Sequence, residues 1–270
     1  MGTIEENGFL SEDIAEEAKK YRKDNEEIFC VCEDINRLGQ KTMLSLNVHN
    51  EHLPTILMAL LLTRVISNFQ GIILLAERGM INEAKILTRC ALELMFAIVA
   101  IEKDNKFAFE IVKNDWFEKR KLLNAIIEDN CLGSQDIKIA KEELDKTIQE
   151  IKASNLKEIS KRDMAIKAGF IHMYNSAYRM LSGTIHASVR SLNENIGIKG
   201  DKIHDFEWGP VYQGMNFILL TAAEALLHIL EGAFQVFSIK ERGELDSLLH
   251  RFKKTWGSFE KSEKNGNKQP

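Results

Sequence analysis

The chain has 270 residues, of which 44% are hydrophobic and 28% charged, and it has a net charge of −4 and an isoelectric point of about 6.0. This balance is typical of a globular protein and excludes an intrinsically disordered chain. The weakly acidic charge excludes a surface that attracts nucleic acid as a whole, so any RNA site must be a local basic patch.

Helical periodicity dominates the sequence, and only 3 prolines interrupt it. Capping residues such as Ser11 and Ser134 begin helices, and Gly39, Gly79 and Gly169 end them. The predicted helices cover residues 11–37, 53–78, 82–103, 106–129, 134–153, 156–168, 170–195, 211–237 and 241–256. Short connections between long helices predict an all-α fold, an up-and-down multi-helix bundle in a single domain.

Two segments are expected to lack regular structure, the loop at residues 196–209 and a disordered tail at residues 259–270, so the predicted domain covers residues 1–258. Residues 53–76 are apolar and long enough to span a membrane. Arg64 and Asn68 near the middle of this stretch predict a buried core helix instead. The N-terminus is acidic and unlike a secretory signal, so we expect a cytoplasmic protein without membrane contact.

The helix predicted for residues 170–195 carries a polar stripe beside its apolar one. At about 100° per residue the stripe consists of His172, Asn175, Arg179, Ser182, His186, Arg190 and Asn193. Arg179 and His186 lie two turns apart, roughly 10 Å along the axis, so both can reach one phosphodiester. The arginine would bind the phosphate, and the histidine would act as general acid or base without a metal or another cofactor. The alternative is a hydrogen-bonded polar seam between helices.

A second polar feature, Arg89 and Glu93, lies in an otherwise apolar run of the helix predicted for residues 82–103. Charges there are costly unless paired, and arginine before glutamate is the less favourable order for a pair within one helix. We therefore expect both residues to engage another helix. One interpretation is a buried ion pair worth about 3–5 kcal/mol when broken. The other is that Glu93 orients Arg179 or His186 in one cluster between the two helices.

The residues from Arg179 to His186 resemble the Arg-x4–6-His motif of the HEPN superfamily, in which the position after the arginine is usually polar and is Met180 here. The resemblance implies an α-helical ribonuclease of toxin–antitoxin or phage-defence systems. It also implies that Arg179 and His186 are the catalytic pair and meet their symmetry mates at a homodimer interface. Asn175 on the same stripe is expected to support the site.

A wider pattern runs from roughly Leu53 to Leu230 and resembles a bacterial family of unknown function. That family pairs an Arg-x3-Glu helix with a later Tyr/Leu-Ser-x3-His helix, and the matching residues here are Arg89, Glu93, Tyr178, Leu181, Ser182 and His186. This resemblance implies the fold and no activity. Tyr178 and Ser182 are thereby added to the expected supporting residues.

Three functions remain open from the sequence. The first is a metal-independent endoribonuclease acting on RNA, with an antitoxin or defence partner. The second is a non-enzymatic helical interaction module, and the third is a small-ligand sensor whose pocket contains Arg89, Glu93, Arg179 and His186. No metal site is expected, because Glu224 and the residues near it lack the Glu-x-x-His pairs of di-iron bundles.

Overall fold

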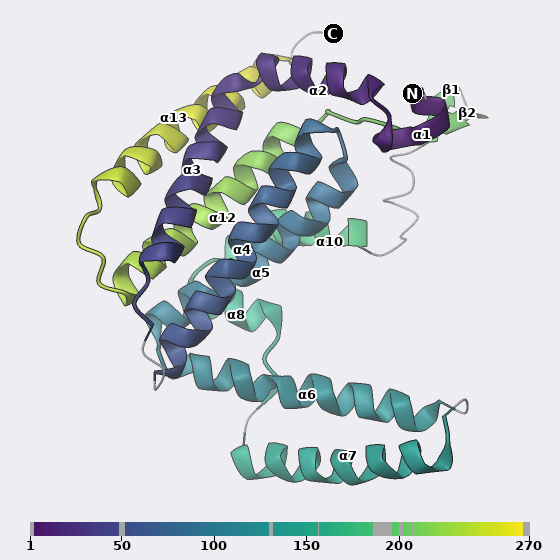
Figure 1. The fold of residues 1–270 in the computed structure, drawn as a ribbon, viewed down its shortest axis with the longest axis vertical. Coiled ribbons are helices and arrows are strands. Elements are labelled where there is room, and N and C mark those ends of the chain that lie inside the picture. Colours follow the sequence, from purple (N-terminus) through teal and green to yellow (C-terminus); the bar gives the residue numbers. More distant parts are fainter. Residues whose placement is uncertain are drawn as a thin grey trace.

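The computed structural model describes residues 3–48, 52–129, 132–155, 157–185, 196–199, 202–206 and 208–266. The chain is all-α in its architecture, which confirms the predicted fold class (Figure 1). The main helices are α2 (Asp13–Asp24), α3 (Glu26–Ser45), α4 (Leu53–Glu77), α5 (Ile81–Lys103), α6 (Phe107–Glu128), α7 (Ser134–Ser154), α8 (Lys161–Ala168), α10 (Arg179–Ile185), α12 (Met215–Val236) and α13 (Gly243–Gly266). Shorter elements are α1 (Ile4–Asn7), a 3-10 turn (Gly8–Leu10), α9 (Ile171–Met173) and a π-helical turn (Tyr174–Tyr178).

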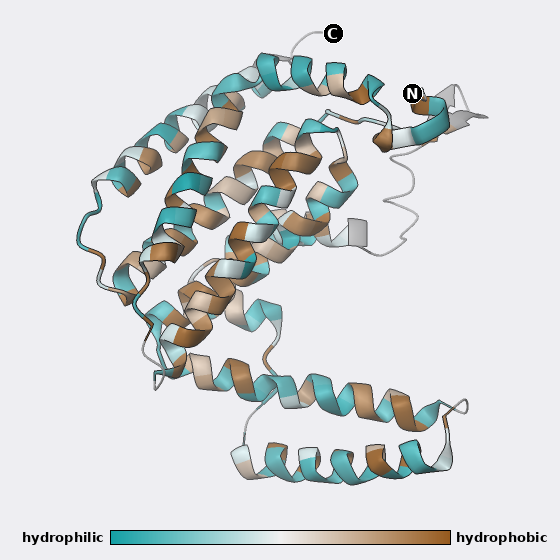
Figure 2. Ribbon diagram, in the orientation of Figure 1, coloured by the Kyte–Doolittle hydropathy of each residue, from teal (hydrophilic) through white to brown (hydrophobic). Residues whose placement is uncertain are grey.

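The core lies between α3, α4, α5 and α12, with α12 packed against the other three. Figure 2 shows hydrophobic residues gathered along α4, α5 and α12. Large side chains such as Phe29, Phe69 and Phe96 are almost completely buried there. Burial of a side chain of this size stabilises the fold by about 1.5–3 kcal/mol. Most residues of α12 are apolar and buried, because other helices surround it.

Two helices, α4 and α12, are long and apolar enough to cross a membrane by length and composition, which is weak evidence for a membrane protein. Within the fold, 78% of the apolar window of α12 is buried, and 44% of that of α4. The core helix of a soluble protein has the same properties, and this is the role that the sequence predicts for residues 53–76.

The α6–α7 hairpin projects from the bundle (Figure 1). The two helices pack mainly against each other, with few contacts to α4 and α5. Lys119 and Glu143 join them at 2.5 Å, and the Asn114 side chain accepts a hydrogen bond from the backbone N–H of Ile159 at 2.7 Å. The hairpin is amphipathic and largely exposed, unlike the apolar helices of the core.

Of the helix ends predicted at glycines, the one at Gly79 is confirmed and the one at Gly39 is wrong. Gly79 ends α4 with φ +69°, and a Cβ there would lie 2.7 Å from the Cβ of Pro210. Gly39, by contrast, does not end a helix, because α3 continues to Ser45. A Cβ at Gly39 would lie 3.4 Å from Ile66, so the glycine permits the close approach of α3 to α4. The first predicted helix is also divided at Asn25 into α2 and α3.

The segment predicted as a loop at residues 196–209 contains an antiparallel hairpin of β1 (Ile196–Lys199) and β2 (Lys202–Phe206). In this hairpin Ile198 pairs with Ile203. These are the only strands among the described residues. At the C-terminus, α13 extends to Gly266, beyond Phe259 where the tail was predicted to begin, because Phe259 packs against the core.

Candidate functional site

Arg89 and Glu93 lie on the side of α5 that faces α10, as the sequence predicts for a pair that engages another helix. Arg89 donates through Nε to the hydroxyl of Ser182 at 3.1 Å and through Nη2 to the hydroxyl of Tyr178 at 2.8 Å. The guanidinium carbon lies 4.9 Å from the Tyr178 ring centroid. Arg89 therefore ties α5 to both the π-helical turn and α10.

The carboxylate of Glu93 has three partners in the same place. Its Oε1 accepts from the Tyr178 hydroxyl at 3.0 Å and pairs with Arg89 Nη2 at 3.1 Å. Its Oε2 pairs with Lys161 Nζ of α8 at 3.2 Å. We call these five residues, Arg89, Glu93, Lys161, Tyr178 and Ser182, the polar cluster. Its two cations and one carboxylate leave it with a net positive charge.

The polar cluster is half-buried, which corrects the prediction of a buried pair. The side chains of Arg89 and Glu93 are 21% and 20% exposed, and that of Lys161 is 49% exposed. Tyr178 is buried at 5% exposure. Burial, together with the charge of Glu93, raises the pKa of Tyr178 to about 12, so its hydroxyl stays protonated and donates.

The π-helical turn from Tyr174 to Tyr178 directly precedes Arg179 and changes the rotational phase of the helix. Arg179 and Ser182 both follow this turn, so on α10 they stay about 60° apart, enough for one to face α5 and the other solvent. The wider turn shifts only the residues before it, such as Asn175, relative to both. Ser182 faces α5 within the polar cluster, whereas Asn175 and Arg179 are exposed. The predicted single cluster of Arg179 with Glu93 is therefore not formed in the described structure.

His186 lies outside the residues that the structure describes, so its predicted place beside Arg179 and its catalytic role stay predictions. The polar cluster brings together four of the expected supporting residues, Arg89, Glu93, Tyr178 and Ser182. Lys161 is the member that sequence reasoning missed. It begins α8 after the Ser160 capping box, and nothing in the spacing of this charged segment indicates that it reaches Glu93.

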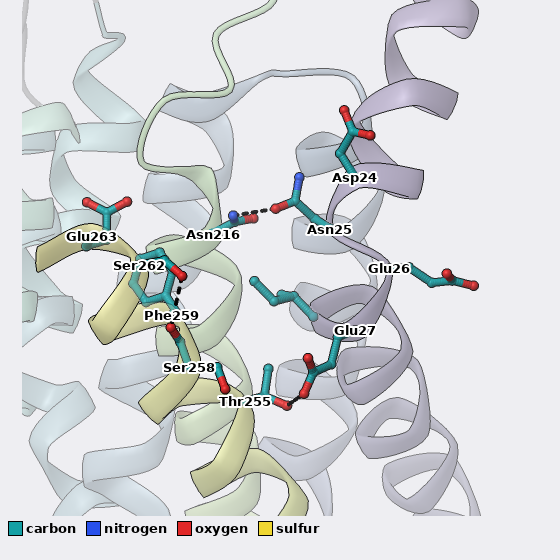
Figure 3. Close-up of a pocket in the computed structure, with 11 residues that line it drawn as sticks. Asp24, Asn25, Glu26, Glu27, Asn216, Thr255, Ser258, Phe259, Ser262 and Glu263 are labelled. Carbon is teal, nitrogen blue, oxygen red and sulfur yellow. Dashed lines mark hydrogen bonds between the residues drawn. The ribbon is translucent and has the colours of Figure 1, made fainter. Parts of the chain in front are cut away.

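A cavity of about 290 Å3 opens where α2 and α3 meet α12 and α13 (Figure 3). Its amides pair with each other, Asn216 donating to Asn25 at 2.6 Å, and Thr255 donates to Glu27 at 2.9 Å. Glu26 points away from these groups. Because its central polar atoms are already paired, this cavity lacks converging reactive groups. No group of three or more potential ligands among the described residues could hold a metal ion.

Comparison with known proteins gives one match. Residues 55–203 match the model of a family described as "Family of unknown function (DUF5677)". This range contains all five members of the polar cluster and ends within β2. No curated protein and no solved structure matches the chain.

Proposed function

The chain belongs to DUF5677, a family of unknown function, and we propose from its own residues that it cleaves RNA without a metal ion. Arg179 binds the scissile phosphate and stabilises the charge that develops on it. His186 accepts the proton of the ribose 2′-hydroxyl, and the leaving 5′-oxygen takes a proton from water. The 2′-oxygen attacks the adjacent phosphorus as the bond to the 5′-oxygen breaks. The products are a 2′,3′-cyclic phosphate and a 5′-hydroxyl end.

The observation that carries this proposal is the exposure of Arg179 beside a fixed polar cluster. Tyr178, the preceding residue, is buried and hydrogen-bonded, so the helix is held against α5 while Arg179 faces solvent. No ion pair of Arg179 with another described residue competes for its guanidinium. The net positive charge of the polar cluster also favours an approaching phosphate.

We propose that the site is completed in a homodimer. In this dimer the α10 helices of the two copies lie next to each other, and both Arg179 side chains face one groove. A partner such as an antitoxin would then inhibit cleavage by covering that groove. Size-exclusion chromatography with light scattering measures the mass of the protein in solution. A monomeric mass at the concentration of the cleavage assay would contradict the proposed dimer.

The test is incubation of the purified protein with mixed RNA in EDTA. We expect cleavage with 2′,3′-cyclic phosphate ends, and a loss of rate of at least about a hundredfold in His186→Ala and Arg179→Ala. Arg162→Ala is the matched control, because Arg162 is an exposed arginine of α8 outside the polar cluster. Absence of cleavage, or equal cleavage by wild type and His186→Ala, would overturn the proposal.

The α6–α7 hairpin favours a second function, that of an interaction module that binds a second copy of the chain through this hairpin. Phe109 and Val112 on α6 are 48% and 45% exposed, and they lie one helical turn apart on a hairpin that projects from the bundle. If the hairpin is an interface between copies, Phe109→Ser should lower the mass in solution and leave RNA cleavage by the remaining monomer to be measured separately. An unchanged mass would contradict this second function.

A further inference from the structure

A cavity of about 370 Å3 lies between the π-helical turn, α12 and α13, and none of the polar cluster lines it. Its lining consists of Gly169, Phe170, His172, Met173, Ser176, Ala177, Phe217, Thr221, Glu224 and Trp256. Phe217, Thr221 and Glu224 follow one another at spacings of four and three, so they share one face of α12. The volume lies in the range of small-ligand sites.

The walls of this cavity are aromatic. Phe170, Phe217 and Trp256 are half-buried, and the rings of Phe217 and Trp256 lie 6.2 Å apart at 60°. The indole N–H of Trp256 donates a hydrogen bond to Glu260 at 2.9 Å. The ring therefore offers the cavity its face or edge and no free hydrogen-bond donor. Such walls stack on flat groups and attract cations to the faces of the rings.

Two polar groups in the cavity lack partners among the described residues. Thr221 is 1% exposed, and its hydroxyl has no hydrogen bond. Glu224, one turn further along α12, has neither a hydrogen bond nor an ion pair in the described part of the chain, and burial raises the pKa of its carboxyl. The nearest basic group on α12, His228, is paired with Glu231 at 3.1 Å and packs against Phe170. Three buried threonine hydroxyls among the described residues, those of Thr42, Thr88 and Thr221, are enclosed without a partner, so in this cavity it is Glu224 that presents an unpaired polar group to a ligand.

We propose that this cavity binds a guanidinium group, supplied either by free arginine or by an arginine side chain of another polypeptide. A guanidinium is planar, stacks on aromatic rings and donates two parallel hydrogen bonds to a carboxylate such as Glu224. The lining contains no lysine or arginine, so it has no clamp for the phosphate of a nucleotide, and His172 is its one side chain that can carry a positive charge. This binding is independent of RNA cleavage by Arg179 and His186.

The probes are Nα-acetyl-arginine methylamide, its citrulline counterpart and free arginine. Citrulline has nearly the same shape but no charge, so it isolates the pairing with Glu224. Binding is followed through the indole N–H resonance of Trp256, assigned with Trp256→Phe. We expect a saturable shift with the arginine probe and binding weaker by at least about tenfold with the citrulline probe. Equal affinity for free arginine and the capped probe indicates a side-chain site, and tighter binding of the free amino acid indicates a metabolite site.

Glu224→Gln should weaken the arginine probe by about tenfold. Glu83→Gln is the matched control, an exposed glutamate of α5 outside the cavity, and should leave the affinity unchanged. The proposal is overturned by no saturable shift, by equal binding of the two capped probes, or by unchanged affinity in Glu224→Gln. Saturable binding of guanosine in place of arginine would also overturn it, because the cavity would then recognise a nucleobase.

Discussion

Removing the carboxylate of Glu93 tests how firmly the polar cluster holds α10 against α5. Glu93→Ala leaves the hydroxyl proton of Tyr178 without its acceptor in a residue that is 5% exposed, and an unsatisfied buried group of this kind costs about 1–3 kcal/mol. Arg89 keeps Ser182 and Tyr178 as partners and also reaches water, so its lost ion pair contributes no more than about 1 kcal/mol. Lys161 is 49% exposed and contributes little.

Alanine is favoured in a helix by a few tenths of a kcal/mol over glutamate, which offsets a small part of this loss. We therefore expect the free energy of unfolding to fall by about 2–3 kcal/mol, less than the cost of breaking a fully buried pair. Urea unfolding followed by circular dichroism measures it. Glu83→Ala is the control, since Glu83 is an exposed glutamate of the same helix. A loss below about 0.5 kcal/mol, the scale of ordinary surface substitutions, would refute the reasoning.

Two further predictions concern Tyr178 and Gly79. Because the pKa of Tyr178 is raised from 10.0 to about 12 in the fold, its contribution to stability is complete below pH 10 and is lost as the pH rises through about 12. Tyr178→Phe should therefore lose less stability than wild type over this alkaline range, which a series of urea unfolding curves measures; parallel losses would contradict the assignment. Gly79→Ala should cost about 2 kcal/mol or more, because φ is +69° and its Cβ would lie 2.7 Å from Pro210. Gly257→Ala, which meets nothing within 4 Å, should instead raise the melting temperature, and equal effects of the two substitutions would exclude the contact with Pro210 as the cause.

Much of the fold can be predicted from short-range patterns in the sequence. Apolar residues at helical spacing predict the core helices, Pro54 lies in the first turn of α4, and Gly79 and Gly169 end α4 and α8 with positive φ. The need of Arg89 and Glu93 for partners follows from their apolar surroundings. These features depend on neighbours within one or two turns, so a single sequence carries enough information to predict them.

Other features depend on contacts between distant segments. Gly39 could be either a helix end or a close approach between helices, and only the position of Ile66 decides between them. The choice of Lys161 as a partner of Glu93 depends on how α8 returns to α5 after the α6–α7 hairpin. In the π-helical turn before Arg179, the rings of Tyr174 and Tyr178 stack on each other and both contact Phe96. The local sequence alone does not predict this turn, because it depends on the contact with Phe96 of α5.

The different positions of Ser182 and Arg179 on α10 determine how mutant activities have to be interpreted. Ser182 and Tyr178 hold α10 from within the polar cluster, whereas Arg179 is exposed. A loss of RNA cleavage in Glu93→Ala would therefore report the position of the helix and should be accompanied by a loss of stability. A loss in Arg179→Ala with unchanged stability would report contact with the phosphate itself, because an exposed side chain contributes little to packing. Comparing stability and rate in the two variants thus separates a positioning role from a catalytic one.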